Sequence, residues 1–225
     1  MAKTIKVFWN ENLEGYIRAE EIKGQYCKVY PLLSPIAKSY SGYRLILKDL
    51  EVVKKVLAEL RGLKMVETSS IVKQSLSFYA VITYGKCFSE AKGRGCQLNK
   101  KDALKYCSLE IKEEHDLIID QRNKYVAHGE LKGYEQNPVV AYLSPDLNNK
   151  KIIKIQDNLM SLVDIESQLS NFDILIECVI QYVKEKCDKV GNKLREELLK
   201  ESLEVIYNNS ITVSSDDLIE VKVSQ

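Results

Sequence analysis

The stretch from Ile71 to Lys92, IVKQSLSFYAVITYGKCFSEAK, places apolar residues on nearly every side of a helix. Such a helix normally forms the buried centre of a bundle, because only neighbouring helices can cover all of its faces. The preceding ETSS supplies capping side chains. Before it, residues 45–60 (LILKDLEVVKKVLAEL) repeat apolar residues at helical spacing and stop at Arg-Gly. The two segments predict a mainly helical fold.

Two further helices and a hairpin are predicted downstream. Asn99 and Asp102 resemble a capping pair, and the helix they open runs to about His128, where Gly129 can end it. Two short apolar runs around the turn-rich PDLNNK predict a β-hairpin at about residues 138–157. A last long helix starts near Ser161 and Asp164. Its apolar stripe, which serves either the core or a partner helix, comprises Ile165, Leu169, Phe172, Ile176, Val179 and Val183.

The two ends of the chain are harder to interpret. Residues 1–45 contain candidate strands in KTIKVFW and YCKVYPLLSPIA, but the prolines and the absence of a clear period leave their structure uncertain. Residues 206–225 form a tail that is either a strand or frayed. We therefore expect an N-terminal appendage (1–45), a helical domain (46–205) that contains the hairpin, and a C-terminal tail.

Composition narrows the classes of function. The chain has 225 residues, of which 45% are hydrophobic and 29% charged, as in an ordinary soluble globular protein. No apolar run is long enough for a membrane span, and the N-terminus lacks the apolar core of a secretory signal, so we expect a cytoplasmic protein with no membrane partner. Six scattered cysteines and two histidines do not form a zinc motif, and we expect neither a metal nor another cofactor.

A net charge of +1 means that any contact with nucleic acid must be local. The best local candidate is KCFSEAKGRGCQLNKK, which contains Lys86, Lys92, Arg94, Lys100 and Lys101. A solvated loop is the alternative interpretation of this charge cluster.

Arg122 lies on the wrong face of its predicted helix. At roughly 100° per residue, it falls in the middle of an apolar face, with His115 about 20° away. A guanidinium there needs either a carboxylate from a neighbouring helix, for which Glu90 and Glu177 are candidates, or a wet groove. His128 at the helix end can share that groove. An arginine that bridges helices, together with a histidine bonded to free carbonyls, is the structural alternative.

The segment RNKYVAHG resembles the signature of the HEPN superfamily (higher eukaryote and prokaryote nucleotide-binding domains), in which an arginine and a polar residue precede a histidine. Arg122, Asn123 and His128 match these positions. The wider context, TYGKCFSEAKGRGCQLN followed by EEHDLIIDQRNKYVAHG, is similar to bacterial phage abortive-infection proteins of the AbiU type. The resemblance covers roughly residues 65–185. Glu130 stands where HEPN proteins silenced by nucleotidylation carry a tyrosine.

The resemblance implies a HEPN-like helical bundle that dimerises, with two Arg/His pairs facing one cleft, and a metal-independent endoribonuclease in active members. His128 would move protons, Arg122 would stabilise charge on the phosphate, and Asn123 would hold one of them or the RNA. RNA supplies its own nucleophile, the 2′-hydroxyl, so this chemistry requires no metal. The expected setting is a toxin or phage-defence (abortive infection) system with an antitoxin or defence partner. The alternative is a non-catalytic RNA-binding or protein-interaction module.

Three further residues are candidates for binding RNA. Tyr84, Lys86 and Lys92 lie on the helix before the motif, where a ring and two cations would suit a single strand. Tyr84 as a plain core residue is the alternative. The far wall of the groove is expected to come from a second copy of the chain, because a two-fold axis supplies it with the same helix.

Overall fold

The computed structural model of the chain describes residues 3–63, 70–90, 94–123, 135–136, 139–145, 150–157, 160–161 and 169–223. The chain divides into two compact units. A terminal unit combines residues 1–40 with residues 188–225, and a helical unit spans residues 41–187.

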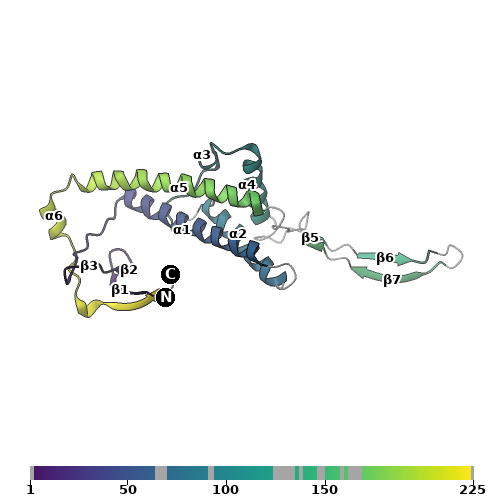
Figure 1. Cartoon of the computed structure of the whole chain (residues 1–225), viewed down its shortest axis with the longest axis horizontal. Coiled ribbons are helices and arrows are strands. Elements are labelled where there is room, and N and C mark those ends of the chain that lie inside the picture. The colour runs from purple at the N-terminus through teal and green to yellow at the C-terminus, as the bar shows by residue number, and fades with distance from the viewer. Residues whose placement is uncertain are drawn as a thin grey trace. The chain divides into compact units, whose positions relative to one another are not determined.

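Helices dominate the described residues, which confirms the predicted mainly helical class (Figure 1). The helices are α1 (Pro35–Gly62), α2 (Ser70–Cys87), α3 (Lys100–Ala103), α4 (Leu109–Gln121), α5 (Leu169–Leu198), α6 (Leu203–Asn208) and the 3-10 helix η3 (Ser215–Asp217). The strands are β1 (Lys3–Asn10), β2 (Gly15–Arg18), β3 (Glu21–Ile22), β4 (Gln25–Tyr26), β5 (Glu135–Gln136), β6 (Val139–Leu143), β7 (Ile152–Asp157), β8 (Met160–Ser161) and β9 (Ile219–Val223). No helix among the described residues combines the length and apolarity that a bilayer crossing requires.

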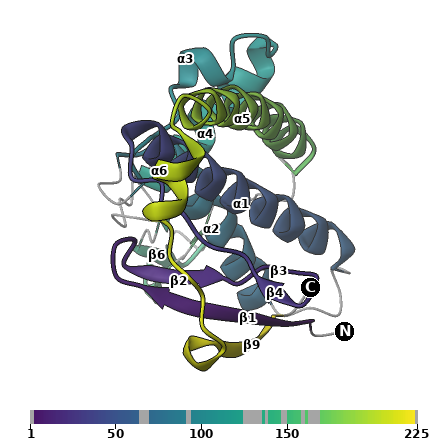
Figure 2. The same ribbon diagram turned by 90° about the vertical axis from the view of Figure 1, so that its left-hand side faces the viewer.

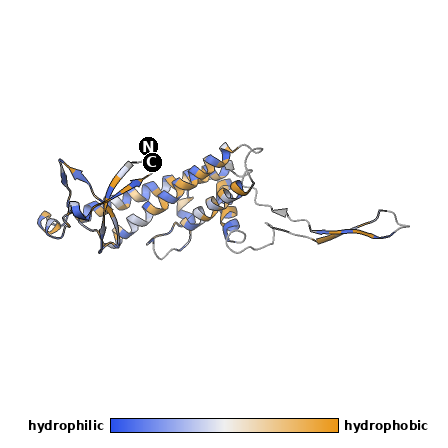
Figure 3. Cartoon of the chain, turned by 90° about the horizontal axis from the view of Figure 1, so that it is seen from below, coloured by the Kyte–Doolittle hydropathy of each residue, from blue (hydrophilic) through white to orange (hydrophobic). Residues whose placement is uncertain are grey.

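The helical unit is built on α1 and α5, which lie antiparallel. Lys54 pairs with Glu177 and Arg61 pairs with Asp173, so residue numbers rise along one helix as they fall along the other. Between them the core collects the apolar stripes of both helices, where hydrophobic residues gather in Figure 3. The stripe predicted for the last helix is confirmed at four buried positions, Phe172, Ile176, Val179 and Val183. The start predicted near Ser161 is wrong, because Ser161 belongs to β8 and α5 begins at Leu169.

Helix α2 buries only part of its surface. Ala80, Val81, Tyr84 and Cys87 are fully enclosed, as predicted for a central helix. Other apolar side chains on α2 remain about half exposed among the described residues, namely Val72, Tyr79 and Ile82. These three share one side of the helix at helical spacing. The prediction of a helix covered on all sides is therefore correct for one face only within the described part of the chain.

The helix predicted from Asn99 to about His128 is divided in two. Asn99 caps α3 as predicted, by accepting a hydrogen bond from the Lys101 N–H at 2.9 Å. The chain then turns, and Ser108 accepts from the Ile111 N–H to open α4. Ser108 with Glu110 in the following first turn is an N-terminal signal that the sequence analysis did not use. Residues 124–130 lie outside the described residues, so the predicted end at His128 is untested.

The predicted hairpin is confirmed. Strands β6 and β7 pair antiparallel from Val139 opposite Asp157 to Leu143 opposite Ile152, inside the predicted 138–157. The short strands β5 and β8 also pair antiparallel, with Glu135 opposite Ser161.

The two ends of the chain share one sheet, which the sequence analysis did not foresee. The order of the three-stranded antiparallel sheet is β2-β1-β9, and it joins Lys3 in β1 to Val223 in β9 (Figure 2). Val7 and Phe8 of β1 are buried, as is Val213 in the segment between α6 and η3. The proposed appendage (1–45) and tail (206–225) are thus parts of one unit, and the boundary expected at residue 46 falls inside α1. Pairing between strands so far apart leaves no local signal.

Candidate functional site

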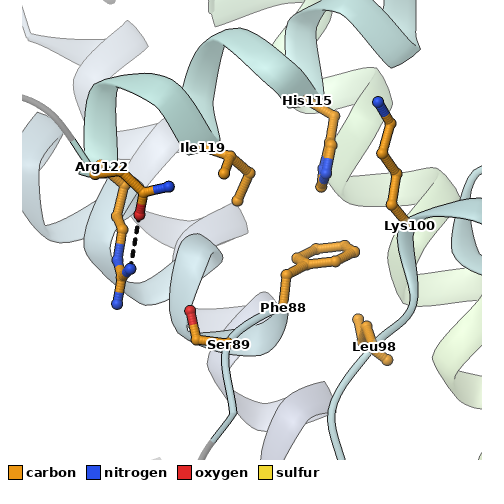
Figure 4. A pocket seen from close by; sticks show the side chains of 8 residues that line it. Phe88, Ser89, Leu98, Lys100, His115, Ile119 and Arg122 are labelled. Carbon is orange, nitrogen blue, oxygen red and sulfur yellow. Dashed lines mark hydrogen bonds between the residues drawn. The ribbon is translucent and has the colours of Figure 1, made fainter.

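A pocket of about 290 Å³ lies beside the end of α4 in the helical unit. Side chains from three parts of the unit line it: the residues that follow α2, the start of α3 with the segment before it, and one side of α4 with its C-terminal end (Figure 4). The lining residues are Phe88, Ser89, Leu98, Lys100, His115, Ile119, Arg122 and Asn123.

Helix α4 aims three residues into this pocket. His115, Ile119 and Arg122 are four and three residues apart, which places them on one side of a helix. Ile111 and Ile118, close to the same side, are buried against the rest of the unit. The predicted juxtaposition of Arg122 and His115 is therefore correct, and the face that carries them borders a pocket rather than a sealed core.

Arg122 is the C-cap of α4, and Asn123 fixes its guanidinium. The Arg122 Nη1 donates a hydrogen bond to the Asn123 Oδ1 at 2.7 Å, drawn as a dashed line in Figure 4. No carboxylate among the described residues forms an ion pair with Arg122, and Glu177, one of its expected partners, pairs with Lys54. An amide orients the guanidinium without neutralising its positive charge.

Gly85 of α2 allows the arginine to lie where it does. A Cβ at position 85 would come within 2.9 Å of the Arg122 Cγ and 3.2 Å of its Cδ. The aliphatic stem of Arg122 therefore packs directly on the backbone of α2, and any larger residue at position 85 would displace it.

His115 is a site residue that the sequence analysis placed on the correct face but did not select. Its Nδ1 lies 2.7 Å from the Tyr84 hydroxyl, and its ring packs edge-on against Phe88, with 4.6 Å between centroids. Burial, aided by the nearby charge of Lys100, lowers the His115 pKa to about 4. The ring is therefore neutral at physiological pH, and since Tyr84 occupies Nδ1, Nε2 is the nitrogen left for a ligand.

This neutral histidine predicts a pH dependence of stability. An unfolded histidine titrates near 6.5, so as the pH falls from about 6.5 to about 4 the unfolded chain gains a proton that His115 in the folded chain does not. The free energy of unfolding should then fall across this window, by up to roughly 3 kcal/mol. Urea unfolding between about pH 7 and about pH 4 measures it. The variant His115→Gln should remove this part of the slope, and an equal slope in both proteins would contradict the assignment.

The residues predicted to bind RNA do not line the pocket where the structure describes them. Tyr84 is fully buried beside Phe172 and His115, which leaves no ring face for a nucleobase and matches the core alternative. Lys86 pairs with Asp49 at 3.3 Å, and Arg94 pairs with the same carboxylate, so Asp49 offsets part of the positive charge of the predicted basic cluster. Lys92 and His128 lie outside the described residues.

Lys100 is the second cation at the pocket. The sequence analysis counted it only within the charge cluster, because it did not predict the turn at Ser108 that brings Lys100 beside His115 (Figure 4). Lys100 also pairs with Asp116 on α4, with both side chains largely in water. An exposed pair of this kind contributes at most about 1 kcal/mol, so an arriving phosphate can take the place of Asp116.

Among the described residues, no group of three or more histidine, cysteine or acidic side chains is arranged to hold a metal ion. In comparisons with known proteins, no protein-family model, no curated protein and no solved structure matches the chain.

Proposed function

We propose that the chain is a metal-independent endoribonuclease of HEPN type that cleaves RNA through the RNA's own 2′-hydroxyl. The observation that carries this proposal is the pocket in which Arg122, held by Asn123 and free of carboxylate partners among the described residues, lies near a second cation, Lys100. A pocket with two cations and a neutral histidine suits a phosphodiester. In line with the HEPN resemblance, the setting would be a toxin or phage-defence system with an antitoxin or defence partner.

The proposed reaction assigns one role to each motif residue. A base removes the proton of the 2′-hydroxyl, the oxygen attacks the adjacent phosphorus, and the 5′-oxygen leaves with a proton from an acid. His128 is assigned the proton transfers. Arg122 stabilises the charge that builds on the phosphate oxygens, and Asn123 holds the guanidinium in place. His115, neutral and bonded to Tyr84, is better suited to hold the substrate than to exchange protons.

A homodimer is part of the proposal. The apolar side of α2 formed by Val72, Tyr79 and Ile82 is about half exposed among the described residues, and it lies on the same helix that supports Arg122 through Gly85. If this side packed against the same side of a second copy, the Arg122 pockets of both copies would lie close to the two-fold axis of the dimer. Two arginines near an axis repel each other unless an anion lies between them, which favours binding of a phosphate backbone.

A non-catalytic HEPN module that holds RNA is the second candidate. One observation favours it: the described pocket supplies cations and a neutral imidazole, which are groups for binding an anion. Binding without cleavage would distinguish this candidate from the first.

Cleavage of cellular RNA in excess chelator tests the proposal. The dimeric fraction from size-exclusion chromatography should produce fragments that end in a cyclic phosphate or a 3′-phosphate, because the 2′-oxygen is the nucleophile. Gel analysis of the fragments, with the protein's mass measured in the same fraction, gives both results together.

Three outcomes would count against the proposal. A requirement for added metal would exclude the mechanism. Fragments that end in a 3′-hydroxyl would exclude the 2′-oxygen as nucleophile. A clean monomer at micromolar concentration would remove the composite site.

A further inference from the structure

A second depression adjoins the pocket. It has a volume of about 570 Å³ and is lined by Asn99, Lys100, Lys101, Leu104, Lys105 and Lys112, a set named here the lysine groove. Lys100 lines both the lysine groove and the pocket that holds Arg122, so the two depressions meet at this side chain.

The lysine groove concentrates positive charge in a chain that is almost neutral overall. Four of its six lining residues are lysines, whereas the whole chain carries a net charge of only +1. Among the described residues no acidic side chain lines it, and of the four lysines only Lys100 forms an ion pair, with Asp116. Positive charge gathered in a concave surface attracts an extended polyanion far more strongly than the same charges scattered over a face.

An exposed aromatic ring adjoins the lysine groove. Tyr106, in the turn between α3 and α4, is 91% exposed, the highest fraction of any large hydrophobic side chain that the structure describes. The Lys105 Nζ lies 5.1 Å from the centre of its ring. A solvent-facing ring beside a row of lysines is the combination that binds single strands, because bases stack on the ring while the cations follow the phosphates.

From this arrangement we propose that the lysine groove holds the single-stranded RNA that flanks the scissile phosphate, with a base stacked on Tyr106 and the strand passing Lys100 into the pocket of Arg122. The proposal rests on the proposed function for the identity of the strand, yet it concerns binding and not the chemical step. Two features favour a single strand over a duplex or an acidic protein: the row of cations leads into a small pocket, and the free ring offers a face to an unpaired base.

The test measures RNA affinity as a function of salt. The triple variant Lys101→Glu, Lys105→Glu and Lys112→Glu leaves Lys100 intact, because Lys100 also lines the pocket. Fluorescence anisotropy with a single-stranded RNA of about twelve nucleotides should show roughly ten- to hundredfold weaker binding at low salt. The slope of log Kd against log salt should also fall by about 2, since each lost phosphate contact on a single strand removes about 0.7. Tyr106→Ala should weaken binding by about five- to hundredfold with little change in slope.

Matched controls separate the lysine groove from general charge effects. Lys48→Glu, Lys55→Glu and Lys184→Glu make the same charge change at exposed positions on α1 and α5 of the same unit, and this variant should keep most of the affinity. A dinucleotide reaches only the pocket. An NMR titration should therefore give the same dinucleotide affinity for the groove variant and for the wild type.

The outcomes decide the proposal in either direction. An unchanged affinity and slope in the groove variant would overturn it, as would an equal loss for the dinucleotide or an equal loss in the control variant. Binding of anionic vesicles in preference to RNA would also overturn it. Suppose that neither the wild type nor any variant cleaves RNA, while the salt dependence and the difference between the twelve-nucleotide RNA and the dinucleotide appear as expected. The proposed catalysis would then be wrong, and RNA binding in the lysine groove would be supported.

Discussion

Replacing Arg122 by alanine is expected to lower the rate of RNA cleavage by about a hundredfold or more, because the variant loses a charged donor at the phosphate. His128→Ala should reduce cleavage to background. Gly85→Ala should cause a smaller loss, since its methyl group would displace the Arg122 stem without removing the guanidinium. Single-turnover kinetics with protein in excess over RNA measure the chemical step in all three variants.

Two comparisons make this result specific to the site. Arg44→Ala removes an exposed arginine of α1 outside the pocket and should leave the rate unchanged. Arg122→Lys keeps the charge but loses the forked donor geometry, so most of the activity should still be lost. A wild-type cleavage rate in Arg122→Ala would contradict a catalytic role for Arg122. It would favour the structural alternative, an arginine that bridges helices. Circular dichroism of each variant shows whether a loss comes from unfolding instead.

Replacing Gly42 by alanine should destabilise the helical unit by about 3 kcal/mol. Glycine to alanine within a helix normally stabilises by up to about 1 kcal/mol, so the expected sign is reversed. The reason is a close approach, because a Cβ at position 42 would overlap the backbone carbonyl oxygen of Arg94 and the Cys96 Sγ. Backbone cannot rotate away as a side chain can, so the segment after α2 would have to move.

That movement would also disturb an ion pair. Arg94, whose side chain is only 9% exposed, pairs with Asp49 of α1, and separating a buried charge from its partner adds to the cost. Gly62→Ala, at the end of the same helix, is the control, because no heavy atom lies within 4 Å of the added carbon. Urea unfolding followed by circular dichroism should rank Gly62→Ala at or above the wild type and Gly42→Ala well below both. Equal midpoints for the two variants would contradict the close approach.

The features that the sequence predicted correctly are those set by neighbouring residues. The apolar period of α5 fixes its buried stripe at Phe172, Ile176 and Val179, whatever packs against it. The turn-rich PDLNNK between two β-branched runs specifies the β6–β7 hairpin. Arg122 and His115 share a side of α4 because they are seven residues apart, two turns of a helix.

The partners of charged and aromatic side chains depended on residues far away in the chain. Lys86 looked like a free cation, but it pairs with Asp49 of α1, which also pairs with Arg94. Tyr84 looked like a ring available for stacking, but Phe172 of α5 and His115 of α4 enclose it. Burial and pairing of a polar group are set by whatever helix packs against it, and a single sequence does not specify that neighbour.

The local amino-acid sequence thus determined that the chain is mainly helical and which side of α4 carries Arg122, because these follow from contacts within one or two turns. Tertiary structure alone decided that β1 pairs with β9 at the other end of the chain, and that the turn at Ser108 brings Lys100 to both the pocket and the lysine groove. Such contacts form only when the entropy of closing a long loop is offset by burial of the whole unit, so they are a property of the folded chain and not of any segment.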